Sequence, residues 1–106
     1  MDEQEFRRAA EDALGALMQH LIERVKDENT GFDAEEQSGA LNILFEEFGD
    51  KFVVTPNTPV RQIWISALAT SFKLDWDAAA KNFVLPRTGE ALIPLVDRLI
   101  REHLED

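Results

Sequence analysis

The spacing of apolar residues changes twice along the chain and divides the sequence into three parts. Over residues 3–27 apolar residues recur every three or four positions, which is typical of one face of an amphipathic helix. Over residues 32–85 they occur in short runs that tend to alternate with polar residues, which is typical of half-buried strands. From Thr88 onward the helical spacing returns, with Thr88 as the expected N-cap. The pattern predicts a helix, a series of strands and a second helix.

The first helix is predicted to have a wide apolar face and an acidic face. Its apolar face carries Phe6, Ala10, Ala13, Leu14, Leu17, Met18, Leu21, Ile22 and Val25. At about 100° per residue, the acidic side chains that gather on the other side are Glu5, Asp12, Glu23 and Asp27. The inner face of the second helix carries Leu92, Leu95, Val96, Leu99, Ile100 and Leu104. Each helix therefore needs an apolar surface to cover.

Six short segments have the composition or alternation of strands. They are residues 32–36, 40–45, 51–55, 60–66, 72–75 and 82–85. The first is acidic, so we expect it at a sheet edge, where charge discourages further pairing. Consecutive strands joined by short turns pair mainly antiparallel. We therefore predict a single α+β domain over residues 1–106, a two-layer α/β sandwich with both terminal helices on one face of a sheet of about five or six strands.

The segment 60–66 places a tryptophan on the sheet face that the helices leave open. Ile63 and Ile65 point to one side, whereas Gln62, Trp64 and Ser66 point to the other. An exposed tryptophan is either a cross-strand neighbour covered by other side chains or an anchor for a binding partner. The basic residues Arg61 and Lys73 are expected nearby and would add positive charge to an acidic protein.

Charge and cysteine content narrow the classes of function. With 21 acidic and 11 basic residues the net charge is −10, which repels nucleic acid and anionic membranes and attracts metal cations or a basic protein surface. The absence of cysteine excludes disulfides, thiolate zinc sites, thiolate-bound iron–sulfur clusters, persulfide carriage and cysteine nucleophiles. We find neither a cationic leader nor a membrane-spanning apolar stretch, and we expect a cytoplasmic protein.

Carboxylates on the first helix and first strand are the candidate metal ligands. Glu23 and Asp27 are four residues apart on one helical face, and Asp33 and Glu35 share one face of a strand. Such surfaces suit hard or borderline cations bound weakly, although an acidic face can also be merely solvated. His20 and His103 are each isolated in the sequence, and we expect both at or near the surface. No motif for catalysis is present, so we predict that the protein is not an enzyme.

Several segments together resemble the frataxin family over nearly the whole chain. The most specific is residues 58–65 (TPVRQIWI), which is similar to the family signature of proline followed after two residues by glutamine, an aliphatic residue and tryptophan. Residues 38–43 (SGALNI) resemble the family's glycine-led second strand. Residues 75–76, 81–83 and 88–90 are similar to the next strands and the start of the last helix.

The resemblance implies a role in iron homeostasis and iron–sulfur cluster assembly. Frataxins bind iron, as Fe²⁺ or Fe³⁺, on an acidic ridge formed by the first helix and first strand. They also dock onto the complex of a cysteine desulfurase with its scaffold protein and modulate sulfur transfer. The resemblance thus implies a monomer that binds iron weakly, accepts other divalent cations, can oligomerise with iron and can show weak ferroxidase activity.

Carried over position by position, the resemblance assigns two sets of site residues. The iron-binding ridge falls on Glu23, Asp27, Glu28, Asp33 and Glu35, extended by Asp12 and Glu5. The docking surface falls on Gln62, Trp64 and Ser66, with Arg61, Lys73 and Asn57 beside them. The chain departs from the family at residues 55–57 (TPN), where a polar and basic patch is usual, and at residues 69–71 (ATS), where a glycine-rich loop is usual.

Two other functions remain open from the residues alone. One is a small acidic interaction module, such as a chaperone or adaptor, that uses the Trp64 face without any role for metal. The other is a calcium-buffering domain, which is less favoured because the sequence has no loop with calcium-ligand spacing.

Overall fold

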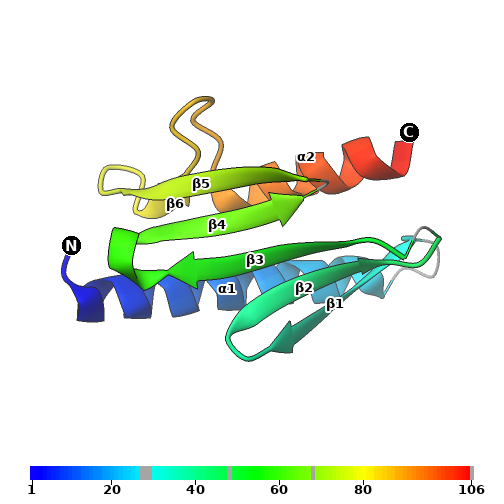
Figure 1. The fold of residues 1–106 in the computed structure, drawn as a ribbon, viewed down its shortest axis with the longest axis horizontal. Helices are drawn as coiled ribbons and strands as arrows, with labels where there is room; N and C mark the ends of the chain where they lie inside the picture. Colours follow the sequence, from blue (N-terminus) through cyan, green and yellow to red (C-terminus); the bar gives the residue numbers. More distant parts are fainter. Residues whose placement is uncertain (27–29, 48, 68, 106) are drawn as a thin grey trace.

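The computed structural model describes residues 1–26, 30–47, 49–67 and 69–105, and these form two helices and one sheet (Figure 1). The elements in chain order are α1 (Glu3–Val25), β1 (Phe32–Gln37), β2 (Ala40–Phe45), β3 (Lys51–Asn57), the 3₁₀ helix η1 (Thr58–Val60), β4 (Gln62–Ala67), β5 (Thr70–Asp77), β6 (Asn82–Val84) and α2 (Leu92–Glu105).

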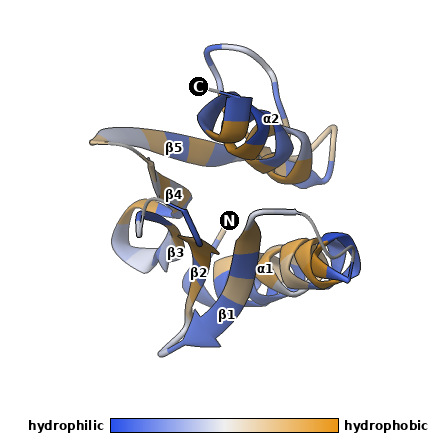
Figure 2. Ribbon diagram, turned by 90° about the vertical axis from the view of Figure 1, so that its right-hand side faces the viewer, coloured by the Kyte–Doolittle hydropathy of each residue, from blue (hydrophilic) through white to orange (hydrophobic). Residues whose placement is uncertain are grey.

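The six strands are paired in sequence order, and every neighbouring pair is antiparallel. The acidic strand β1 lies at one edge and β6 at the other, as charge patterning predicted for β1. Both helices lie on the same side of the sheet (Figure 2). The predicted two-layer α+β sandwich is therefore confirmed, and neither of the two described helices lies over the other face of the sheet.

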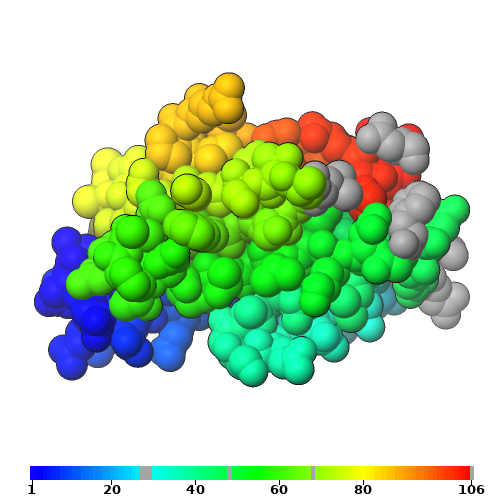
Figure 3. Space-filling view, viewed as in Figure 1, coloured from blue at the N-terminus to red at the C-terminus, as the bar shows by residue number. Residues whose placement is uncertain are grey.

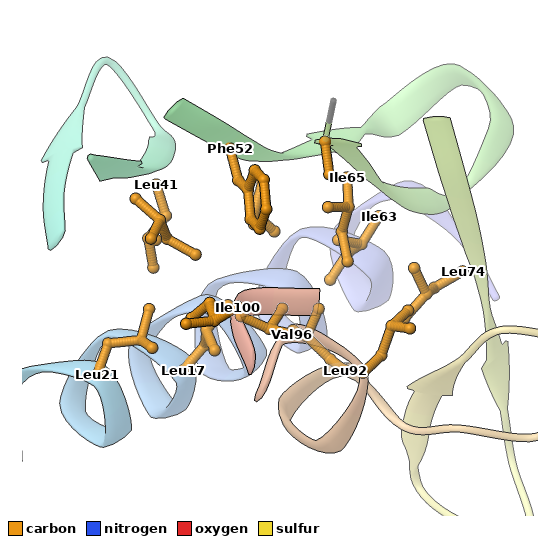
Figure 4. Packing of buried hydrophobic residues seen from close by; sticks show 14 of the residues in the cluster. Leu17, Leu21, Leu41, Phe52, Ile63, Ile65, Leu74, Leu92, Val96 and Ile100 are labelled. Carbon is orange, nitrogen blue, oxygen red and sulfur yellow. The ribbon is translucent and has the colours of Figure 1, made fainter. Parts of the chain in front are cut away.

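One hydrophobic cluster fills the space between the helices and the sheet. Leu17 and Leu21 of α1 point toward the strands, as do Leu92, Val96 and Ile100 of α2 (Figure 4). The sheet contributes Leu41, Phe52, Val54, Ile63, Ile65 and Leu74, all at most 1% exposed. These residues alternate along their strands with side chains on the open face, so burial of one set places the other set at the open surface.

The turn before β4 differs from the prediction. We expected the strand to begin at Val60, but Thr58–Val60 form a 3₁₀ helix and β4 begins at Gln62. Pro59 fits the first turn of a helix, and Arg61 ends it in a left-handed conformation with φ 56°. Strand β3 is also longer than expected and continues through Asn57, with Pro56 opposite Ile63.

The predicted end of the first helix and the predicted start of the second both differ from the structure. α1 ends at Val25, while the predicted end at Asp27 lies outside the described residues. α2 begins at Leu92, so Thr88 is not its N-cap. The Thr88 hydroxyl instead accepts a hydrogen bond from the backbone N–H of Glu90 within the preceding turn.

Glu90 also connects this turn to α2. Both oxygens of its carboxylate accept hydrogen bonds from the guanidinium of Arg98, and these bonds lower the pKa of Glu90 below its ordinary value.

The two histidines differ in their accessibility. His103 is 9% exposed and packs against the rings of Phe45 and Phe52, with Nε2 3.5 Å from a carboxylate oxygen of Asp50. His20 is half-buried, and its Nε2 lies 2.9 Å from Oδ2 of Asp97. The expectation of a histidine at or near the surface holds for His20, whose side chain is 34% exposed, but was wrong for His103. Helical spacing alone did not show that Phe45 and Phe52 would cover His103.

Replacing Ala69 with glycine is expected to stabilise the protein. Ala69 has φ 66°, a left-handed conformation in which a Cβ is strained but glycine is not. Ala69→Gly should raise the free energy of unfolding by about 0.5–1 kcal/mol, measured by urea denaturation. Ala80→Gly is the matched control, since Ala80 is not among the residues with positive φ and should lose stability on the same change. Stabilisation by both substitutions, or by neither, would contradict the explanation.

Candidate functional site

The candidate docking surface lies on the open face of the sheet, centred on β4. In the space-filling view the side chains of β3 and β4 face the viewer, and no helix covers them (Figure 3). Trp64 is opposite Thr55 on β3 and Lys73 on β5, so these three side chains share one row across the sheet. Gln62 is opposite Asn57 and Asp75 in the next row. The predicted open-face position of Trp64 thus follows from the observed register.

Trp64 is held in place by polar contacts on this face. Its indole Nε1 donates a hydrogen bond of 2.8 Å to Oε1 of Gln62, and Nε2 of Gln62 donates one of 2.8 Å to Oδ1 of Asp75. The ammonium of Lys73 lies 4.8 Å from the centre of the indole ring, a cation–π contact. The indole is half-buried by these neighbours. It is therefore a partly covered side chain with a defined orientation.

Four other docking candidates occupy different positions around Trp64. Lys73 is in contact with the indole, as described above, and Ser66 is exposed opposite Ser71. Asn57 is half-buried beside Gln62, so the departure from the family at residues 55–57 keeps a polar side chain on this face. Arg61 differs from the prediction in its contacts, since its guanidinium donates to the backbone carbonyl of Thr58 and supports the turn.

Asp75 is a contact residue that sequence reasoning missed. It was not among the predicted site residues, although it lies opposite Gln62 in the β4–β5 register. Pairing the two predicted strands around their short turn would have aligned the two positions. The sequence does not show that the Asp75 carboxylate and the Gln62 carboxamide would form a hydrogen bond, because this depends on the conformations of both side chains.

The predicted iron-binding carboxylates are spread over the surface. Glu23 is exposed and pairs with Lys26 at 3.2 Å, and the carboxylate of Asp33 accepts the backbone N–H of Ala34 at 2.8 Å. Glu35 lies two residues after Asp33 on the same strand face and is also exposed. Asp27 and Glu28 lie outside the described residues. The end of α1 and the start of β1 are close together, since Lys26 and Asp33 line one shallow hollow.

Glu5 and Asp12 occupy a separate part of the surface. Glu5 belongs to a capping box with Asp2, whose carboxylate accepts the backbone N–H of Glu5 at 2.8 Å. Both Glu5 and Asp12 line a hollow with Trp76 near the start of α1. At 1.5 Å per residue, Glu5 lies roughly 27 Å along the helix from Glu23. Glu5 and Glu23 therefore cannot bind the same ion.

The donor set fits iron only as a weakly held ion. Among the described residues no three side chains of His, Cys, Asp or Glu come together as a metal site. Carboxylate oxygens are donors that suit Fe²⁺ and Fe³⁺, and water would complete the coordination shell of an ion held by few of them. The described helices also include none that is long and apolar enough to cross a membrane.

Comparison with known proteins gives the family. Residues 1–106, the whole chain, match the family model described as the frataxin-like domain. The chain belongs to the frataxin family. The frataxin resemblance inferred from the sequence is thus confirmed.

Curated relatives and a solved structure agree with this frataxin assignment. An iron–sulfur cluster assembly protein CyaY from Azotobacter vinelandii is 27% identical over 88 residues, covering 83% of this chain and 79% of that protein. A protein of the same name from Pseudomonas aeruginosa is 29% identical over 91 residues, covering 86% and 83%. The solved frataxin from Psychromonas ingrahamii matches with a TM-score of 0.79 and 20% identity, covering 100% of this chain and 94% of that one. The last likeness concerns the fold alone.

Proposed function

We propose that this protein is an iron-binding regulator or iron donor in iron–sulfur cluster assembly. It acts in the cytoplasm by docking its open sheet face onto the complex of a cysteine desulfurase and its scaffold protein. The observation that carries the proposal is the Trp64 indole, which is oriented by Gln62 and Lys73 at the centre of a sheet face that no described helix covers. Tryptophan is among the residues most enriched at the energetic hot spots of protein interfaces.

Composition supports a regulating or delivering role over a role in carrying sulfur or clusters. Curated relatives of this chain bear the name iron–sulfur cluster assembly protein. The chain has no cysteine, so it can hold neither a persulfide nor a thiolate-bound cluster. What remains for it in such a process is to contact the machinery, to bring iron, or both. We propose no catalytic group for it.

The acidic surface supports weak iron binding. The net charge of −10 raises the local concentration of cations near the protein. Exposed carboxylates at Glu23, Asp33 and Glu35 supply hard oxygen donors for Fe²⁺ or Fe³⁺ and would accept other divalent cations as well. Asp27 and Glu28 complete the proposed ridge, and Glu5 and Asp12 form a second, separate acidic area.

Titration with ferrous iron under anaerobic conditions is expected to affect particular residues. Paramagnetic broadening in ¹H–¹⁵N spectra should appear first at Glu23, Asp27, Asp33 and Glu35. It should leave Asp77 unaffected at low iron, because Asp77 ends β5 at the β5–β6 turn beside the start of α1, at the other end of that helix from Glu23. A variant with Asp33 and Glu35 changed to Asn and Gln should require several times more iron for the same broadening near β1. Uniform broadening of all acidic residues would favour an interaction module without a specific metal role.

A further inference from the structure

Asp75 ends a chain of hydrogen bonds that reaches the indole of Trp64. Its Oδ1 accepts from Nε2 of Gln62, and Oε1 of Gln62 accepts from Nε1 of Trp64, both at 2.8 Å. An ionised carboxylate can only accept hydrogen bonds, whereas a carboxamide has one accepting and one donating end. Asp75, which accepts, and the indole N–H, which can only donate, therefore favour the same orientation of the Gln62 carboxamide. With Nε2 directed at Asp75, the accepting oxygen is left for the indole.

We propose that Asp75 is a positioning residue of the docking surface. Acting through Gln62, it holds the Trp64 indole in one orientation and supplies the indole N–H with an acceptor inside the protein. This role of Asp75 rests on the proposed docking function. Because the indole N–H is satisfied within the protein, the role also limits the chemistry that a partner presents to the indole.

The partner's contact with Trp64 is an apolar recess without a hydrogen-bond acceptor for the indole. A buried donor that lacks an acceptor costs free energy, so an indole with a free N–H would require an acceptor on the partner. Here the N–H is already bonded to Gln62, and only the ring is offered. One face of that ring lies under the Lys73 ammonium. The partner thus reaches the other face or the edge, and a carboxylate beside the recess would meet the charge of Lys73.

Asp75 is suited to this role because it contributes little to the fold itself. It is exposed and lies on the open face of β5, away from the hydrophobic cluster. Its hydrogen bond to Gln62 joins an exposed side chain on β5 to a half-buried side chain on β4. These two strands are already paired through their backbones. Removing the carboxylate should change the state of the indole while the protein stays folded.

Two substitutions separate the hydrogen bond from the charge. Asp75→Ala removes the acceptor, whereas Asp75→Asn removes the charge but keeps an Oδ1 that can accept from Gln62. The indole N–H signals of Trp64 and Trp76 are compared in ¹H–¹⁵N spectra of the free protein, with Trp76 as the internal reference. We expect Asp75→Ala to shift the Trp64 signal and to speed its exchange with solvent about fivefold or more. Asp75→Asn should remain close to the wild type.

Binding to the desulfurase–scaffold complex is measured with the same proteins by calorimetry. Asp75→Ala should weaken it about five- to tenfold, the loss expected for one hydrogen bond, and Asp75→Asn less than about twofold. Urea denaturation of each variant verifies that the fold is intact.

Three results would count against the positioning role of Asp75 or against the docking function, and the results distinguish the two. An unchanged Trp64 signal in Asp75→Ala, or equal effects of both substitutions, overturns the positioning role. A released indole with wild-type binding overturns its importance for recognition. If the wild-type protein does not bind the complex, the docking function fails, and the indole spectra still decide whether Asp75 positions Trp64.

Discussion

Trp64→Ala is expected to weaken binding to the desulfurase–scaffold complex by about 2–4 kcal/mol, which is at least a tenfold loss. The indole is the largest apolar side chain on the open face, and its orientation is fixed before binding by Gln62 and Lys73. An anchor that is ordered in the free protein loses little conformational entropy when a partner covers it. Truncation would also leave Gln62 without its donor and Lys73 without its ring.

The measurement is calorimetric titration of the complex from the same source with wild-type and variant proteins. Arg101→Ala is a suitable control, because Arg101 is exposed on α2, which packs on the opposite face of the sheet. We expect this control to bind within about twofold of the wild type. Equal binding of Trp64→Ala and the wild type would move the docking surface away from the open face. The acidic surface of α1 and β1 would then be examined next.

Phe52→Ala is expected to lower the free energy of unfolding by about 3–5 kcal/mol. Phe52 is 1% exposed in the central strand β3 and points toward the helices (Figure 4). The centre of its ring lies 4.7 Å from that of Phe45 and 5.5 Å from that of His103. Removing the ring loses its transfer free energy and leaves a cavity between the sheet and α2. A loss of this size is a large part of the roughly 5–15 kcal/mol that stabilises a domain of this size.

Urea denaturation followed by far-ultraviolet circular dichroism provides the measurement. Val60→Ala is the control, since Val60 is 51% exposed and its truncation should change stability by less than about 0.5 kcal/mol. Phe52→Leu should fall between the two, because leucine fills part of the same space. A cost below about 1 kcal/mol for Phe52→Ala would mean that β2, β3 and α2 close over the vacated volume, contrary to the tight packing seen here.

Much of the fold could be predicted because local patterns and global packing agree. The alternation in residues 40–45 and 62–66 places Leu41, Ile43, Ile63 and Ile65 in the core, as observed. The predicted start of the second helix was wrong, because Thr88 fits both a helix N-cap and a turn. Residues 86–88 form a turn, Gly89 follows with φ 78°, and Ala91 pairs with Val84 before α2 begins.

The candidate site was predictable only in part. The face on which Trp64 lies follows from the period of two along a strand, and the acidic character of α1 and β1 follows from composition. The separation of Glu5 from Glu23 follows from the length of the helix that carries both. Arg61 was expected to face a partner, but its left-handed backbone directs the guanidinium to the carbonyl of Thr58.

The sequence by itself determined the two-layer architecture, the open sheet face and the acidic surface, because each depends on spacing and composition along one segment. Only the tertiary structure decided which side chains meet. Asp75 reaches Gln62 across two paired strands, and His20 reaches Asp97 across the two helices. Such contacts depend on register, twist and side-chain conformation together, and periodicity carries no information about the last of these. The orientation of Trp64, and with it the chemistry offered to a partner, therefore appears only in three dimensions.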